Sequence, residues 1–166
     1  IASEDLTNWP LIEAVAQTAR PVILSTGMHT VPEAREARSR FHYAEVTMLH
    51  CISEYPVLSE PKMWRMEVLA ELCAPCKVGW SDHMTGTQHA PLAVFMGAQV
   101  IEKHICLTGD TTCVDHAVSA TKEQFALMVK KIQETKMGTR FGNSLAEMIN
   151  FREYLDRKPP VYMEAQ

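Results

Sequence analysis

The sequence predicts an α/β fold built on a parallel sheet. Short runs rich in Val, Ile, Leu and Thr alternate along the chain with amphipathic segments. Strand, helix and strand at this spacing are typical of right-handed βαβ units. The 166 residues, 46% of them hydrophobic, can bury one sizeable core. We therefore expect one ordinary domain, since no repeat, low-complexity tract or linker interrupts the chain before its C-terminal end.

Four apolar runs are the strand candidates. Their Val, Ile, Leu and Thr content favours strands buried on both faces. They span residues 21–26, 44–51, 76–81 and 98–107. The opening residues, "IASED", read as the end of one further strand.

Two helices between and after these strands carry start signals. Thr30 and Glu33 fit a capping box before "AREARSRF", and Thr121 and Gln124 fit another before "FALMVKKIQ". The stretch "PKMWRMEVLAELC" is a further helical segment, placed between the second and third strand candidates.

Composition excludes two classes of partner. The net charge is −4 and the sequence pI is near 6.0, so the chain offers no basic face to a phosphate backbone. The apolar runs are too short to span a bilayer, and the first residues lack the pattern of a signal peptide. We expect no nucleic acid or membrane partner, and a cytoplasmic location.

The pair Cys73 and Cys76 forms the CxxC motif "CAPC". A redox CxxC begins a helix after a strand, whereas Cys73 ends a helical stretch and precedes a proline. No second CxxC completes a zinc site. The motif is therefore interpreted as buried or loop thiols.

Polar side chains follow the strand candidates. In parallel α/β sheets the chemistry lies beyond the carboxyl ends of the strands, so these residues belong together. They are Ser3, Glu4 and Asp5 in the opening, Ser25, Thr26 and Gly27 after the first strand, Ser53, Glu54 and Tyr55 after the second, Ser81, Asp82 and His83 after the third, and Glu102 and His104 on the fourth.

Alternation along the strands predicts which side chains face one another. His83 and His104 would point to one side, while Asp82 and Lys103 point to the other. Two imidazoles from neighbouring strands can hold one divalent ion at about 2.0 to 2.2 Å each. The alternative is a pair of ordinary hydrogen-bonding histidines.

The hydroxyl groups suggest a second kind of site. Ser3, Ser25 and Ser81, with backbone N–H groups of turns and helix starts, could form a cradle for an anion. Ordinary helix caps and turn residues are the alternative interpretation of each serine.

Several linked motifs resemble the N-acetylneuraminate (sialic acid) synthase family. They are "PVILSTGM", "LHCISEYP", "VGWSDH", "GAQVIEKHICL" and the dipeptide at Asp115 and His116, in that order. The resemblance extends from residue 1 to about residue 131. It implies a (β/α)8 (TIM) barrel with Mn²⁺ or Mg²⁺ as cofactor, and a homodimer in the complete enzyme. The implied reaction joins phosphoenolpyruvate to an N-acylmannosamine-type amino sugar, giving a nine-carbon 2-keto sugar acid and phosphate.

The resemblance also implies roles for particular residues. His83 and His104 become the metal ligands, and Glu102 and Asp115 take catalytic roles, with Asp115 also facing the amino sugar. The implied substrate-binding residues are Ser3, Ser25, Ser53, Tyr55, Ser81 and Asp115.

Two departures from the family pattern concern the sugar. Ile52 stands where a threonine is common, and "LTGDTTCVDH" lacks the acidic-basic pair and the Gly-Pro usual before the equivalent of Asp115. This loop faces the sugar in the family, so the resemblance leaves the identity of the sugar open.

The strand count predicts the C-terminal half of a TIM barrel, with four to five parallel strands. A complete barrel takes about 250 residues and eight βα units. We assign residues 1–136 to the partial barrel and residues 137–166 to a C-terminal helix and tail, in which Ser144 and Glu147 suggest a capping box. The lysines and the glutamate of the family's earlier strands are absent. We therefore expect the isolated chain to self-associate and to lack turnover.

Two alternatives to a synthase stay open. One is a half-barrel module for binding or assembly, without turnover. The other is a metal-dependent aldolase or hydrolase on a similar barrel, which strand-end histidines alone would permit.

Overall fold

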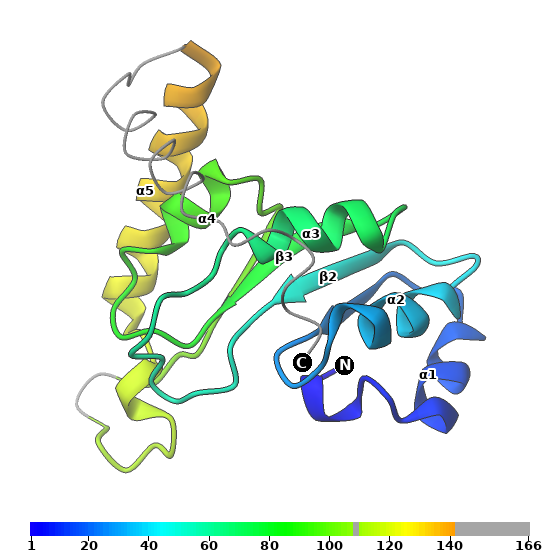
Figure 1. The fold of residues 1–166 in the computed structure, drawn as a ribbon. Coiled ribbons are helices and arrows are strands. Elements are labelled where there is room, and N and C mark those ends of the chain that lie inside the picture. The colour runs from blue at the N-terminus through cyan, green and yellow to red at the C-terminus, as the bar shows by residue number, and fades with distance from the viewer. Residues whose placement is uncertain (108–109, 142–166) are drawn as a thin grey trace.

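The structure is a computed structural model that describes residues 1–107 and 110–141. In this part of the chain, helices and strands alternate as the sequence predicts (Figure 1). The elements are η1 (Ser3–Asp5), α1 (Trp9–Ala16), β1 (Val22–Ser25), α2 (Val31–Ser39), β2 (Val46–His50), α3 (Arg65–Leu72), β3 (Lys77–Asp82), α4 (Ala90–Phe95), β4 (Val100–Lys103), η2 (His116–Val118) and α5 (Lys122–Phe141), where η marks a 3₁₀ helix.

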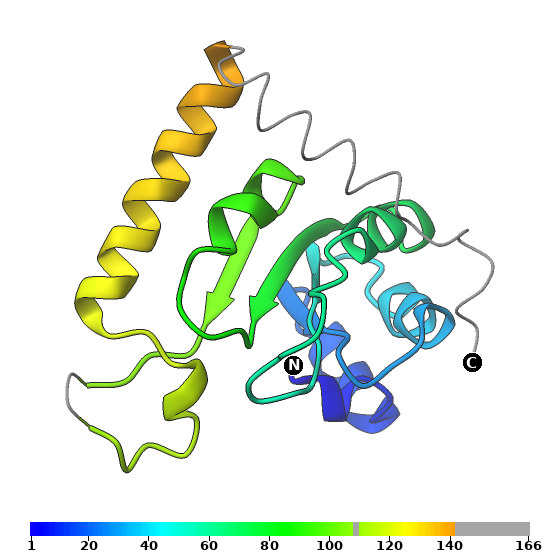
Figure 2. The ribbon, with the colours of Figure 1, turned by 60° about the vertical axis from the view of Figure 1, so that its left-hand side comes forward.

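All four strands form one parallel sheet in the order β1-β2-β3-β4. Figure 2 shows the arrowheads of β3 and β4 pointing the same way, with α5 on the outer side of α4. Because each strand pairs with the next one along the chain, the carboxyl ends of all four meet at one edge. The predicted parallel α/β architecture is confirmed.

The fourth strand is shorter than the sequence predicts, and this changes the setting of His104. The apolar run suggested a strand over residues 98–107, but β4 ends at Lys103. Beyond it the backbone pairs with Ala120 instead of β3: Ala120 N–H donates to His104 O at 2.8 Å, and Cys106 N–H donates to Ala120 O at 3.1 Å. His104 therefore follows the strand directly and does not lie on it.

The helices cover one face of the sheet. Alternate strand residues such as Leu24, Met48 and Trp80 are buried in a core shared with α2, α3 and α4. In Figure 1, α3 and α4 lie on the same side of β2 and β3. The opposite face is more open, with Ile23 exposed to 42%. A barrel turns this face inward, as the predicted half-barrel requires.

The first residue continues the sheet pattern beside β1. The nitrogen of Ile1 donates to Ile23 O at 2.8 Å, and Ser25 N–H donates to Ile1 O at 3.1 Å. These two bonds alternate as in a parallel ladder. The opening residues thus lie where the sequence predicts the end of a further strand.

Both predicted capping boxes are present. The Thr30 N–H donates to Glu33 Oε2 at 2.8 Å, and the Thr30 hydroxyl accepts from the Glu33 N–H. The Thr121 N–H donates to Gln124 Oε1 at 2.8 Å. Across residues 1–107 and 110–141, no helix combines the length and the apolar character needed to cross a membrane. The helix predicted after Ser144 lies outside the described residues, and the division of the chain at residue 136, which α5 crosses, stays a prediction.

The CxxC thiols follow α3. Cys73 ends that helix and is buried, and both Cys73 and Cys76 are free thiols. Burial raises the pKa of Cys73 to about 11 and also raises the pKa of Cys76. A thiolate is thus disfavoured at both positions, in agreement with the interpretation as structural thiols.

Candidate functional site

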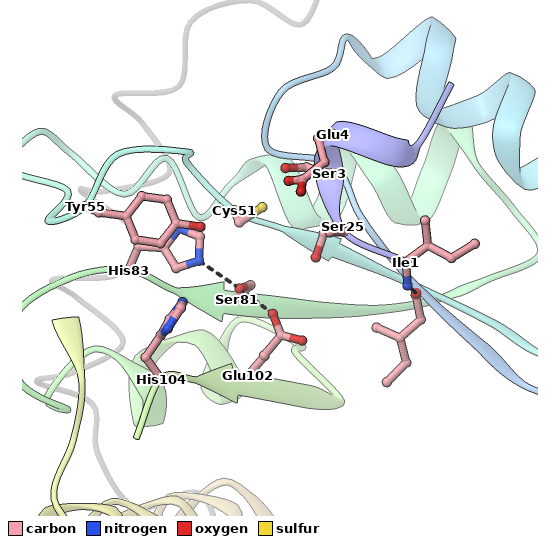
Figure 3. A pocket seen from close by; sticks show the side chains of 12 residues that line it. Ile1, Ser3, Glu4, Ser25, Cys51, Tyr55, Ser81, His83, Glu102 and His104 are labelled. Carbon is pink, nitrogen blue, oxygen red and sulfur yellow. Dashed lines mark hydrogen bonds between the residues drawn. The ribbon is translucent and has the colours of Figure 1, made fainter. Parts of the chain in front are cut away.

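A cavity of about 310 Å³ lies on the open face of the sheet, at the carboxyl ends of the strands. Figure 3 shows Ser3 and Ser25 on one side of it, His83 and His104 on the other, and Ser81 between them. The cavity thus brings together most of the residues predicted for the site. Those that line it are Ser3, Ser25, Tyr55, Ser81, His83, Glu102 and His104.

Ser81 links the two neighbouring strands at the floor of the cavity. It is buried and pairs in register with Glu102 of β4. Its hydroxyl lies 2.7 Å from Glu102 Oε1 and 3.3 Å from His83 Nε2. A serine hydroxyl carries one proton, so it can donate to only one of these acceptors at a time. The shorter contact favours the carboxylate.

His83 is held with one ring nitrogen toward the backbone and the other toward the cavity. Its Nδ1 lies 2.8 Å from Ile52 O, and because a carbonyl only accepts, Nδ1 is the protonated nitrogen. Burial lowers the pKa of His83 and so keeps the ring neutral. With the proton of Ser81 directed to Glu102, the lone pair of Nε2 is available to a ligand.

The two histidines face each other under a tyrosine. The ring centroids of His83 and His104 are 5.3 Å apart. Tyr55 stacks on His83 at 4.1 Å and meets His104 edge-on at 5.6 Å. Since the tyrosine ring is half exposed, it separates the imidazole pair from solvent on one side only.

Asp115 contacts a histidine and does not line the cavity. Asp115 directly precedes η2, and its Oδ2 lies 3.5 Å from His104 Nδ1. A carboxylate at the Nδ1 of an imidazole orients the ring and leaves Nε2 free to act as a ligand. In this structure, Asp115 therefore contacts the site through the imidazole of His104.

Ser53 lies just outside the cavity. Its hydroxyl is 3.5 Å from the hydroxyl of Ser3, which does line the cavity. A methyl group at Gly27 would come within 2.5 Å of Ser53 Oγ and 2.6 Å of Cys51 Sγ. Glycine at position 27 is thus required for the close approach of the first and second strand ends.

Glu4 in η1, one of the polar residues of the opening, also lines the cavity. Cys51, directly after β2, lines it as well, although the sequence analysis gave this residue no role. Strand alternation could have found Cys51, which lies two residues beyond the inward-facing Leu49. Burial raises the pKa of Cys51, so its thiol is neutral and contributes packing to the cavity wall.

The structure contains the two imidazole donors that the metal prediction names, His83 and His104. Across residues 1–107 and 110–141, no group of three or more His, Cys, Asp or Glu side chains is placed to hold a metal ion. The neutral imidazole of His83 and the carboxylate-oriented imidazole of His104 are suitable nitrogen ligands for a divalent ion. They fit a site whose other ligands are water or substrate oxygens, and metal binding stays a prediction.

A parallel half-barrel with helices outside and a polar cavity at the strand ends belongs to the class of α/β barrel proteins. Within that class, this chain belongs to the NeuB family, whose family model matches residues 1–142. The family resemblance seen in the motifs is confirmed.

Relatives and solved structures agree with this assignment. The chain is 41% identical over 136 residues to an uncharacterized protein of Methanocaldococcus jannaschii, covering 80% of this chain and 40% of the relative. It is 35% identical over 139 residues to the pseudaminic acid synthase of Helicobacter pylori, covering 81% and 41%. The crystal structure of the N-acetylneuraminic acid (sialic acid) synthetase from Leptospira borgpetersenii, in complex with citrate, superimposes with a TM-score of 0.79 at 31% identity, covering 95% of this chain and 58% of the other.

These likenesses confirm the predicted half-barrel. The chain spans about 40% of the length of the curated relatives it matches.

Proposed function

We propose that this chain forms part of a phosphoenolpyruvate-dependent sugar acid synthase. The whole protein would join phosphoenolpyruvate to an N-acylmannosamine-type amino sugar and release a nine-carbon 2-keto sugar acid and phosphate. One observation supports this most strongly: Ser81, Glu102 and the facing imidazoles of His83 and His104 converge in one cavity of a NeuB-family chain.

His83 and His104 are the residues that would hold Mn²⁺ or Mg²⁺. Each ring has its Nδ1 engaged, by Ile52 O in one case and by Asp115 in the other. Both imidazoles can thus offer Nε2. Such an ion, when bound, supplies Lewis-acid activation of the sugar aldehyde.

The serines would bind the anionic groups of phosphoenolpyruvate. Ser3, Ser25 and Ser81 present hydroxyl donors to the same cavity. Ser81 needs only to turn its proton away from Glu102 to donate to a phosphate or carboxylate oxygen. The enol carbon C3 would then form its bond to the aldehyde carbon, and the aldehyde oxygen takes up a proton to become a hydroxyl.

Glu102 is placed for proton transfer. Its exposed carboxylate lines the cavity beside Ser81. Water adding at C2 would give up a proton to this carboxylate. Cleavage of the C2–O bond to the phosphate then forms the 2-keto group, and the remaining C2 hydroxyl proton leaves with the phosphate. The proton passed to Glu102 balances the one taken up by the aldehyde oxygen. Asp115 would keep His104 oriented on the sugar side.

The proposal is tested by phosphate release. The 166-residue chain is co-expressed with the N-terminal half-barrel of the H. pylori relative and assayed with Mn²⁺. We expect release only when phosphoenolpyruvate and N-acetylmannosamine or a related amino sugar are both present. Two results would overturn the proposal. One is that an assembled complex binds both substrates without any turnover, as a binding module would. The other is that the complex cleaves a keto acid without phosphoenolpyruvate, as an aldolase would.

A further inference from the structure

A buried ion pair lies behind the two histidines, on the helix-covered side of the sheet. Asp82 and Lys103 are register partners at the ends of β3 and β4. Lys103 Nζ lies 3.3 Å from Asp82 Oδ2, and both side chains are 0% exposed. The two residues directly precede His83 and His104 in the sequence.

The same two side chains hold the backbone on the far side of His83. Met84 N–H donates to Asp82 Oδ1 at 2.8 Å, and Lys103 Nζ donates to Met84 O at 2.5 Å. His83 therefore lies between Asp82, the last residue of β3, and Met84, whose backbone N–H and C=O are both hydrogen-bonded. The lysine that binds Met84 is itself one residue from His104.

Stability alone does not explain such a pair. Burial lowers the pKa of Lys103 and raises the pKa of Asp82, and the attraction between the two charges opposes both effects. Replacing a buried ion pair by apolar residues of similar volume is often neutral or stabilising. A role in fixing a particular geometry accounts better for two charges at this place.

We propose that Asp82 and Lys103 are positioning residues that set the placement of the His83 imidazole relative to that of His104. The two side chains fix strand ends β3 and β4 to each other and to Met84, so the rings emerge from one rigid unit. The inference rests on the proposed function only where it concerns metal affinity. It also explains the central residues of the "SDH" and "EKH" motifs, which face away from the cavity.

The first test measures Mn²⁺ affinity of the full chain by calorimetry. We expect Asp82→Asn and Lys103→Met each to weaken binding about 10-fold to 100-fold, as loss of groups that orient ligands does. The double variant removes both charges, and its fold-loss of Mn²⁺ affinity should be smaller than the product of the fold-losses of the two single variants. The control is Lys77→Met, because Lys77 forms an exposed pair with Glu45 at 2.6 Å at the other end of β3. Its affinity should stay within about twofold of the parent chain.

The second test needs no metal. NMR of ¹⁵N-histidine-labelled chain reports the tautomer of each imidazole. His83 should be held as the Nδ1–H form in the parent chain and in Lys77→Met, and should become a tautomer mixture in Lys103→Met. If Lys103→Met does not fold, the double variant serves for this measurement, because it leaves no buried charge unpaired.

The outcomes separate the two proposals. If the parent chain binds no Mn²⁺ but the His83 tautomer changes in the variants, positioning stands and the metal role fails. If the parent chain binds Mn²⁺ and the folded variants match it in both affinity and tautomer, positioning is overturned and the metal role stands. A loss of affinity in Lys77→Met equal to that in Lys103→Met would also overturn positioning.

Discussion

Ser81 and Glu102 face each other across neighbouring parallel strands, and the serine hydroxyl donates to the carboxylate at 2.7 Å. This contact places a proton donor and a proton acceptor at the junction of the predicted anion and metal sites. It also leaves His83 Nε2 without the serine proton while the bond is intact. The single hydroxyl proton of Ser81 therefore determines whether Glu102 or His83 Nε2 is free to accept another hydrogen bond.

The first prediction concerns metal binding. Replacing His83 or His104 by alanine should weaken Mn²⁺ binding by more than about 100-fold, because the described residues offer few other ligands. Calorimetry on the full chain measures the effect. His42→Ala is the control, since His42 is exposed and precedes the amino end of β2, whereas the cavity lies at the carboxyl ends of the strands. Unchanged affinity in both site variants would remove the metal role.

The second prediction concerns the anion site. Ser81→Ala in the complemented protein should raise the KM for phosphoenolpyruvate or lower kcat, at a cost of about 1 to 3 kcal/mol for a lost hydrogen bond to a charged group. Steady-state kinetics measure it. Ser39→Ala is the matched control, because the Ser39 hydroxyl only donates to Glu36 O on the surface of α2. If Ser81→Ala and Ser39→Ala give the same constants, Ser81 does not contact the substrate.

Strand periodicity explains what the sequence could predict about the site. A period of two places Ser81 and His83 on one side and Asp82 on the other, and the structure has this arrangement. The four strands and both capping boxes also follow from local patterns. Local rules of this kind need no knowledge of distant segments.

Contacts between distant segments could not be predicted in the same way. "HICL" has the composition of a strand, yet its backbone pairs with Ala120, and this pairing ends β4 before His104. The contact of Asp115 with His104 depends on the course of the same loop. The stacking of Tyr55 on His83 likewise depends on a loop after β2 folding across β3. No periodic pattern in the sequence indicates any of these contacts.

The third prediction is a pH dependence of stability that comes from His50. This histidine is buried, its Nε2 lies 2.8 Å from Pro61 O, and burial lowers its pKa from 6.5 to about 4. Between these two values the unfolded chain binds a proton that the folded chain does not. Stability should therefore fall as the pH falls from 6.5 toward 4. The loss from this residue between pH 7 and pH 5 is about 2 kcal/mol.

Chemical denaturation at the two pH values measures this loss. His50→Gln keeps a donor for Pro61 O but does not titrate, so it should remove about 2 kcal/mol of the pH dependence. His42→Gln is the control, because it makes the same substitution at an exposed histidine. Equal pH dependence in the parent chain and in His50→Gln would contradict the assignment.

The fourth prediction concerns the open face of the half-barrel. Among the described residues, β4 has no strand on its outer side, and Ile23 on the uncovered face is 42% exposed. An edge of unpaired N–H and C=O groups is a template for association, and exposed apolar surface on the same sheet favours association further. The 166-residue chain alone should therefore self-associate or be only marginally folded, and it should show no synthase turnover with Mn²⁺, phosphoenolpyruvate and N-acetylmannosamine.

Light scattering over a range of chain concentrations measures the association. Ile23→Thr should reduce it, because it makes the uncovered face more polar without touching the core beneath the helices. The control is Leu58→Thr, since Leu58 is 85% exposed on the loop that follows β2 and its loss should leave association unchanged. Co-expression with the first half-barrel of a relative should restore solubility, because closing the sheet pairs both edges at once. A compact monomer that unfolds cooperatively and turns over substrate alone would show that the uncovered face needs no partner, and the half-barrel interpretation of the site would have to be replaced.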